Sequence, residues 1–229
     1  MTLLINKDFV CHGIRVTIAL PESYDATKTY PAVFLNDGQL DYLGKLANSV
    51  ILIGLEPKNR LDDFTPWYAQ ALRTGSPDFG GKLASYHDQL FGHIFKSVAQ
   101  EFRLDESRMA YGGYSLGGLA AIRSLYSSDK MPFIFSICGS FWYPDFVDYC
   151  QSHQLLNKSC SVYLRNGLTE GANHKNRLAK APSFAKEVHE RIKKQCLSTY
   201  SAFDPYGHHN NLQERYDAFS DWLIEEWKL

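Results

Sequence analysis

Hydrophobic residues along the chain fall into short apolar runs that alternate with longer segments of helical periodicity. This alternation is typical of strand and helix units built around a mostly parallel sheet. Several runs are apolar at every position, as strands covered by helices on both faces require. The predicted strands are Ile14–Leu20, Ala32–Leu35, Val50–Leu55, Met109–Gly112, Phe133–Ile137, Ser161–Leu164 and Thr199–Phe203.

Two segments carry an apolar stripe at helical spacing. One is Ala84–Phe102, and the other begins at Leu212 and ends near Trp227. Between Lys58 and Lys82 the periodicity breaks down, because prolines and a Gly-Gly pair interrupt it. We therefore predict a long loop there, and long loops in compact domains are often functional.

No repeat, low-complexity tract or linker divides the 229 residues, so we expect one domain over residues 1–229. The net charge of −1 indicates neither a nucleic acid nor an anionic membrane as partner. The start of the chain lacks the features of a signal peptide, and no apolar run is long enough to cross a bilayer. We expect a cytoplasmic protein, and the pattern does not predict an oligomeric state.

The cysteines offer no regular pattern. There are 5 of them, scattered and without a C-x-x-C pair. Such spacing is not that of a metal site or a disulfide framework. We expect reduced thiols, no metal and no cofactor.

A G-x-S-x-G motif centred on Ser115 is the first sign of chemistry. An apolar strand, Met109–Gly112, precedes the motif, and a helical stretch rich in small residues, Leu116–Leu125, follows it. The nucleophile elbow of an α/β-hydrolase requires this strand–turn–helix arrangement, with glycines where the strained turn leaves no room for side chains. The alternative is a glycine-rich turn that only packs a helix on a sheet.

A serine nucleophile needs a base and an acid, which in this fold follow it in the order acid, then histidine, each after a strand. Glu170 follows the next-to-last predicted strand and is the candidate acid. His208 and His209 follow the last predicted strand, and one of them is the candidate base. Asp204 is a rival acid, but it is close to the histidines in the same loop. A solvated loop carboxylate is the alternative for Glu170.

Ester hydrolysis also needs N–H donors for the oxyanion that develops on the carbonyl. The backbone N–H of Leu116, directly after the serine, is one expected donor. The predicted strand Ala32–Leu35 leads into an Asn-Asp-Gly-Gln segment. Gly38 permits close approach of the backbone to a substrate, and the N–H of Gln39 is the second candidate donor. An ordinary Asn-Asp-Gly turn is the alternative.

Together these segments resemble the putative-esterase group of α/β-hydrolases, which includes enterochelin-type siderophore esterases, tributyrin esterase and esterase D. The resemblance covers nearly the whole chain. It implies the α/β-hydrolase fold, a mostly parallel sheet with helices on both faces, and a carboxylic-ester hydrolase that needs no metal or cofactor. The matching segments are Pro31–Gln39, Arg60–Trp67, Phe79–Lys82, Gly112–Gly118, Gly139–Tyr143 and Asn166–Glu170.

Carried over by position, the resemblance implies Ser115 as nucleophile, Glu170 as acid and Gly207–His209 as the base loop. The family often ends in G-x-H at this point, which favours His209. If the histidine instead follows the glycine directly, as in G-H, the base is His208. The family frequently has a tryptophan shortly after that histidine, and this chain has two asparagines instead, so both histidines stay candidates.

Two further residues match positions that contact substrate in the family. Trp142 falls where the family lines its acyl or aryl pocket, and a core tryptophan is the alternative. Arg60 falls where the siderophore-esterase branch keeps an arginine, and a structural pairing with Asp62 or Asp63 is the alternative.

Several functions fit this set of residues, each with a small-molecule ester as substrate or ligand. They are a short-chain or aryl carboxylesterase, a siderophore or other natural-product esterase, and a non-catalytic binding protein of the same fold. An acyltransferase would use the same triad, because water and an alcohol compete for one acyl-enzyme.

Overall fold

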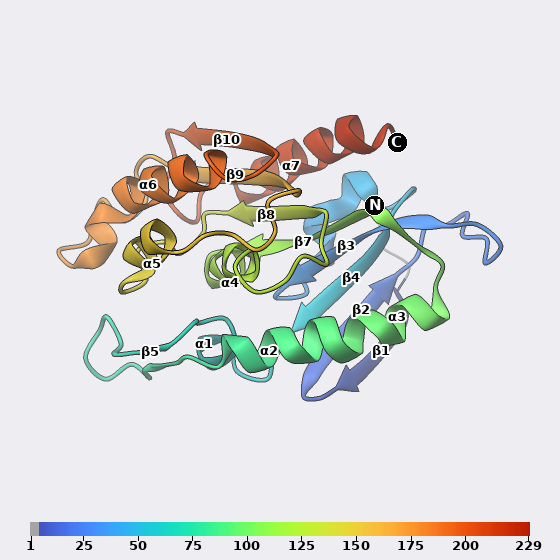
Figure 1. Ribbon diagram of the computed structural model, residues 1–229, viewed down its shortest axis with the longest axis horizontal. Coiled ribbons are helices and arrows are strands. Elements are labelled where there is room, and N and C mark those ends of the chain that lie inside the picture. The colour runs from blue at the N-terminus through green and yellow to red at the C-terminus, as the bar shows by residue number, and fades with distance from the viewer. Residues whose placement is uncertain (1–4) are drawn as a thin grey trace.

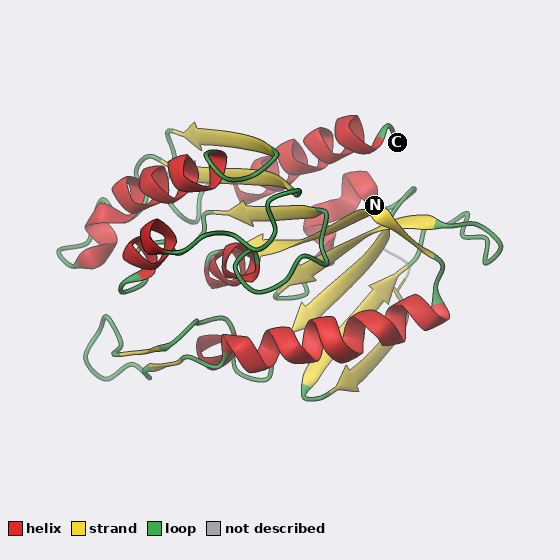
Figure 2. Cartoon of the chain, in the orientation of Figure 1, coloured by secondary structure: helices red, strands yellow, loops and turns green. Residues whose placement is uncertain are grey.

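The computed structural model describes residues 5–229 as a central sheet of eight strands with helices on both faces (Figure 1, Figure 2). The strand order is β1-β2-β4-β3-β7-β8-β9-β10. β2 is antiparallel to both of its neighbours, and every other adjacent pair is parallel. The strands are β1 (Ile5–Cys11), β2 (Ile14–Ala19), β3 (Tyr30–Asn36), β4 (Ile51–Glu56), β7 (Leu104–Tyr114), β8 (Phe133–Ile137), β9 (Ser161–Gly167) and β10 (Ser198–Asp204).

Helices connect most of the parallel strands, and a separate two-stranded sheet pairs β5 (Tyr68–Ala69) with β6 (Phe79–Gly80). A π-helical turn, η2 (Leu90–Ile94), joins α2 to α3, and η1 (Leu40–Leu46) and η3 (Arg177–Lys180) are 3-10 helices. The α-helices are α1 (Arg60–Asp63), α2 (Leu83–Gln89), α3 (Phe95–Glu101), α4 (Leu116–Ser124), α5 (Phe146–Ser152), α6 (Ala181–Lys193) and α7 (Leu212–Trp227).

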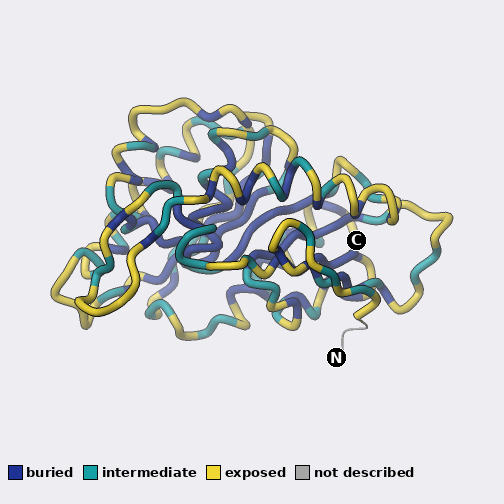
Figure 3. The backbone as a smooth tube through the Cα atoms, turned by 90° about the horizontal axis from the view of Figure 1, so that it is seen from below, coloured by how far each residue is buried: buried dark blue, intermediate teal, exposed yellow. Residues whose placement is uncertain are grey.

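Two apolar cores lie on the two faces of the sheet. One packs the sheet against α2, η2, α3, α4, α5 and α6, and the other packs it against η1 and α7. Successive strand residues serve opposite faces, so Phe34 of β3 belongs to the first core and its neighbours Val33 and Leu35 to the second. Figure 3 shows that the buried residues gather at the centre of the molecule. The predicted α/β-hydrolase fold, with helices on both faces of a mostly parallel sheet, is confirmed.

The seven predicted strands and the three predicted helical stretches all form, with the long helix interrupted by the π-turn η2. The pattern misses β1 because this edge strand contains no buried residue. The stretch between Lys58 and Lys82 is not a loop throughout, since it contains α1, β5 and β6. These elements are too short to show a period. Within residues 5–229, no helix combines the length and the apolarity needed to span a bilayer.

The parallel strands bring distant parts of the sequence to one edge of the sheet. The strands β3, β7, β8, β9 and β10 run in the same direction, so the loops that follow them meet at their carboxyl ends. In open α/β sheets this edge is where ligands bind. Ser115, Glu170 and the pair His208–His209 each lie in one of these loops.

Candidate active site

Ser115 lies between β7 and α4 in a strained backbone conformation. Its φ of 58° and ψ of −119° are rare for a residue with a side chain. Its N–H donates to the Ile137 carbonyl oxygen at 3.0 Å, which holds the turn against β8. A Cβ at either Gly113 or Gly117 would lie 2.9 Å from the Asn36 Cβ, so neither position has room for a side chain. The turn thus has the geometry of a nucleophile elbow and presents Ser115 at the N-terminus of α4.

His208 lies between Ser115 and Glu170. Its Nε2 is 3.0 Å from Ser115 Oγ, and its Nδ1 is 2.7 Å from Glu170 Oε2. Because a carboxylate only accepts hydrogen bonds, Nδ1 carries the proton and Nε2 faces the serine hydroxyl with its lone pair. Three loops, after β7, β9 and β10, thereby bring a hydroxyl, an imidazole and a carboxylate into the arrangement of a nucleophile, its base and an orienting acid.

Glu170 is held as a carboxylate although it is only 3% exposed. Burial acts to raise its pKa, but the hydrogen bond and charge of His208 and the N–H of Gly167 outweigh burial and bring the pKa below its usual value. Its Oε1 accepts from the Gly167 N–H at 2.6 Å and from Asn166 Nδ2 at 3.2 Å. Both carboxylate oxygens are therefore partnered.

His209 makes no hydrogen bond to Ser115, although both residues line the first cavity. Its Nδ1 lies 2.8 Å from the Tyr114 hydroxyl, which also donates to the His208 carbonyl oxygen at 3.0 Å. Arg215 Nη1 donates to that same carbonyl at 3.1 Å and so fixes the loop from the other side. Adjacent loop residues point to different partners, and these contacts turn His208 toward the serine. Of the two candidate bases, this geometry therefore favours His208 over His209.

The two candidate oxyanion donors come from different parts of the chain, the start of α4 and the loop after β3. Leu116 is the first residue of α4, so its N–H has no acceptor within the helix. Gly38 has a φ of 68°, and Gln39 follows it into the 3-10 helix η1. Within residues 5–229, the Gln39 N–H donates to no backbone carbonyl. Both N–H groups are free to bind an oxyanion.

Two cavities meet at Ser115. The first has a volume of about 670 Å³ and is lined by residues that include Gln39, Arg60 and His209. The second has a volume of about 460 Å³, and Trp142 forms part of its wall beside the serine, Glu170 and His208. Trp142 is only partly buried: it forms part of this cavity wall and also packs against the first core.

Arg60 forms an ion pair in the wall of the first cavity. Its Nε and Nη2 donate to the two carboxylate oxygens of Asp37 at 2.7 and 3.0 Å, and Nη2 is also 3.4 Å from the Tyr114 carbonyl oxygen. The structural pairing with Asp62 or Asp63 that the sequence suggests is therefore wrong, since both aspartates bind other groups. The true partner, Asp37, is too far along the chain to be recognised from spacing.

Asp204, the rival acid, is committed to a different buried pair. Its Oδ1 accepts from Arg215 Nη2 at 2.6 Å, and its Oδ2 accepts from Arg215 Nε at 2.8 Å. Arg165 adds a third contact at 3.2 Å. Burial acts to raise the pKa of Asp204, but the hydrogen bonds and charge of Arg215 outweigh it and lower the pKa. Asp204 therefore supports the loop that carries His208.

Replacing Asp204 by asparagine is expected to reduce the free energy of unfolding by about 3 kcal/mol at pH 7, because it leaves Arg215 buried without its counter-charge. Because the pKa of Asp204 is lower in the folded state than the value of about 4 in the unfolded state, its ionisation stabilises the fold above about pH 4. This stabilisation is lost as the pH falls toward the folded-state pKa. Urea unfolding of the wild type and Asp204→Asn should show that the difference in their free energies of unfolding becomes smaller below about pH 4. The exposed Asp129→Asn is the control, and a difference that stays constant down to pH 3 would contradict the assignment.

Ser140 lies next to the candidate nucleophile and has no predicted role. Its Oγ is 3.1 Å from Ser115 Oγ, and its N–H donates to the Ser115 carbonyl oxygen at 3.0 Å. It is 1% exposed. The only sequence signal is its position inside the Gly139–Tyr143 segment that resembles the esterase family. Ser140 thus braces the strained turn from the loop after β8.

Cys138, Glu170 and His208 place possible ligand atoms within 4.8 Å of one another. Arg215 Nη1 lies 2.7 Å from Cys138 Sγ, which puts a positive charge beside the sulfur. A guanidinium in this place opposes the binding of a cation, and Glu170 and His208 are already hydrogen-bonded to each other. We therefore assign these three residues to the hydrogen-bonded site and not to a metal centre.

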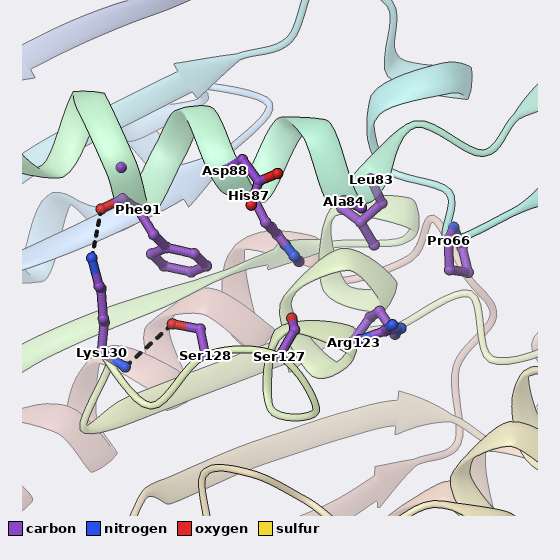
Figure 4. A pocket seen from close by; sticks show the side chains of 11 residues that line it. Pro66, Leu83, Ala84, His87, Asp88, Phe91, Arg123, Ser127, Ser128 and Lys130 are labelled. Carbon is purple, nitrogen blue, oxygen red and sulfur yellow. Dashed lines mark hydrogen bonds between the residues drawn. The ribbon is translucent and has the colours of Figure 1, made fainter.

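A third cavity, of about 330 Å³, lies between α2 and the segment that follows α4 (Figure 4). His87 and Phe91 point into it from the helix, and Arg123 and Ser127 lie on the opposite side. Burial and the charge of Arg123 lower the pKa of His87 to about 3, so its ring is neutral. None of the predicted site residues lines this cavity.

Known proteins match this chain in sequence and in structure. The family described as Putative esterase matches residues 11–224. Uncharacterized protein YbbA of Bacillus subtilis (strain 168) is 28% identical over an alignment 234 residues long, which covers 91% of this chain and 92% of that protein.

Solved structures share the fold at low sequence identity. The IroE-like serine hydrolase from Shewanella oneidensis has a TM-score of 0.78 at 20% identity, over 93% of this chain and 76% of that one. The siderophore hydrolase EstB from Aspergillus nidulans has a TM-score of 0.75 at 16% identity, over 100% and 98% of the two chains. The family match spans almost the entire sequence, and the chain belongs to the putative esterase family.

Proposed function

We propose that the protein is a serine carboxylesterase that hydrolyses its substrate through an acyl-enzyme on Ser115. One observation carries the proposal: His208 lies 3.0 Å from Ser115 Oγ and 2.7 Å from Glu170 Oε2, through its two ring nitrogens. A serine hydroxyl is a weak nucleophile until a positioned base takes its proton. Membership of an esterase family supports the same reaction class.

In the first half-reaction, His208 Nε2 accepts the Ser115 proton as Oγ attacks the ester carbonyl carbon. Glu170 stabilises the resulting imidazolium, and the N–H groups of Leu116 and Gln39 donate to the oxyanion. The bond to the alcohol oxygen then breaks, and His208 returns the proton to this leaving group. In the second half-reaction, His208 deprotonates a water that attacks the acyl carbon, and collapse releases the acid and restores the serine.

The charge of the two cavities supports a neutral aryl or short-chain ester as substrate. Within residues 5–229, Arg60 is the only lysine or arginine that lines either cavity, and Asp37 neutralises it. Glu56 also lines the first cavity. A site of this kind does not favour an anionic iron–catecholate complex. Trp142 offers an aromatic face in the second cavity.

A panel of p-nitrophenyl esters tests this proposal. The wild-type protein is expected to hydrolyse the acetate and the butyrate, with an initial burst of about one p-nitrophenol per site where deacylation is slower. The hemisuccinate, which adds a carboxylate to an acyl chain of similar length, should have a kcat/KM about ten-fold lower, because like charges repel at the site. No turnover across the panel would contradict esterase function, and a preference for the hemisuccinate would contradict the neutral substrate.

Acyl transfer to an alcohol shares every step up to the acyl-enzyme. The two outcomes differ only in whether water or an alcohol reaches the acyl carbon. Product analysis with added glycerol separates them: we expect mainly free acid, and a dominant acylglycerol would assign the protein as an acyltransferase.

A further inference from the structure

A buried histidine outside the triad lies on a hydrogen-bond chain that ends at Glu170. His189, on α6, is 1% exposed. Its Nδ1 is 2.9 Å from Ser201 Oγ, and its Nε2 is 3.0 Å from Asn166 Oδ1. Asn166 Nδ2 in turn donates to Glu170 Oε1 at 3.2 Å. The chain therefore connects β10, α6 and β9 to the acid of the triad.

The chemistry of these groups fixes the direction of each hydrogen bond. Burial lowers the pKa of His189 to about 3, so the ring is neutral and has one donor and one acceptor nitrogen. Asn166 Oδ1 only accepts, so His189 Nε2 carries the proton and Nδ1 accepts from the Ser201 hydroxyl. Asn166 Nδ2 faces two acceptors, Glu170 Oε1 and the Gly139 carbonyl oxygen at 3.4 Å. Reversing the amide would set its oxygen against the carboxylate.

We propose that His189 is a positioning residue for the acid: it fixes the amide of Asn166, which holds the Glu170 carboxylate in line with His208. This inference rests on the proposed esterase function, because it concerns the same triad. A carboxylate is rigid and planar, so the partners of Oε1 determine where Oε2 points. His189 acts at a distance, since it lines neither cavity at Ser115 and its ring lies against two phenylalanine rings.

Two substitutions of His189 separate positioning from packing. His189→Met fills the space without a donor, and His189→Gln keeps an N–H that can reach Asn166 Oδ1. On p-nitrophenyl acetate, the methionine variant is expected to lose about ten-fold in kcat with KM unchanged, and the glutamine variant should stay within about three-fold of wild type. Melting temperatures of both variants report any general loss of packing.

Ser201 gives a second test that does not disturb the core. Ser201→Ala removes the donor to His189 Nδ1, so the ring is free to take the tautomer that lacks the Nε2 proton, and we expect kcat to fall about three-fold. Ser198→Ala, on the same strand, is the control and should leave kcat unchanged. If His189→Met does not fold, the comparison of Ser201→Ala with Ser198→Ala tests the positioning role of His189 instead.

Wild-type kcat in His189→Met or in Ser201→Ala would overturn the proposal. So would an equal loss of kcat in His189→Met and His189→Gln at matched melting temperatures, which would indicate packing alone. Failure of the proposed function is distinguishable, because it would appear as a wild-type protein that turns over no ester, or as turnover that survives Ser115→Ala, whatever the His189 variants do.

Discussion

His208→Ala is expected to lower kcat/KM for p-nitrophenyl acetate by about 10⁴-fold, whereas His209→Ala should stay within about five-fold of wild type. His208 Nε2 is the nitrogen that lies 3.0 Å from Ser115 Oγ, so its removal leaves the hydroxyl without a base. The His209 ring is hydrogen-bonded to the Tyr114 hydroxyl instead. The two histidines are adjacent in one loop, so each variant is a matched control for the other.

The comparison requires that both variants fold. Circular dichroism and melting temperatures should be close to those of the wild type, because both side chains lie at the surface of the site and not in either core. An inactive His209→Ala beside an active His208→Ala would reassign the base to His209. If both variants lower kcat/KM equally and only slightly, neither histidine acts as the base.

Ser115→Ala is expected to lower kcat by about 10⁵-fold, because no acyl-enzyme can form without the hydroxyl. The nearest other hydroxyl belongs to Ser140, whose Oγ is 3.1 Å from Ser115 Oγ. No ring nitrogen is hydrogen-bonded to Ser140 within residues 5–229, so it has no base. Ser140→Ala is therefore the control, and it should keep kcat within about ten-fold of wild type. A loss in Ser140→Ala as large as that in Ser115→Ala would contradict the assignment of the nucleophile.

The sheet is predictable from the sequence because its strands are buried on both faces. β3 and β4 therefore appear as apolar runs with nearly their true bounds, and β8 does so although Ser136 interrupts its run. β1 is exposed or half-buried at every position, so it leaves no such run. The hairpin of β5 and β6 is too short for any period to appear.

The sequence predicts Ser115 and Glu170 as site residues because strand order alone decides which loops meet. The choice between His208 and His209 depends on contacts with Tyr114 and Arg215, which come from other parts of the chain. Neither spacing nor residue type reports such contacts. For the same reason, the Asp37 partner of Arg60 is visible only in the structure.

The contacts of His189 are even harder to predict from the sequence. In the sequence it is one polar residue in the amphipathic segment that forms α6, and nothing near it indicates a link to Glu170. The link depends on Asn166, which β9 brings beneath α6. Only a folded chain places these side chains in contact.

Covalent labelling tests the central claim, that Ser115 is an activated nucleophile. A fluorophosphonate probe should add one adduct to the wild-type protein, and peptide mapping should place it on Ser115. Ser115→Ala should show no adduct and no hydrolysis of p-nitrophenyl acetate. An adduct on another residue, or turnover retained in Ser115→Ala, would contradict this mechanism.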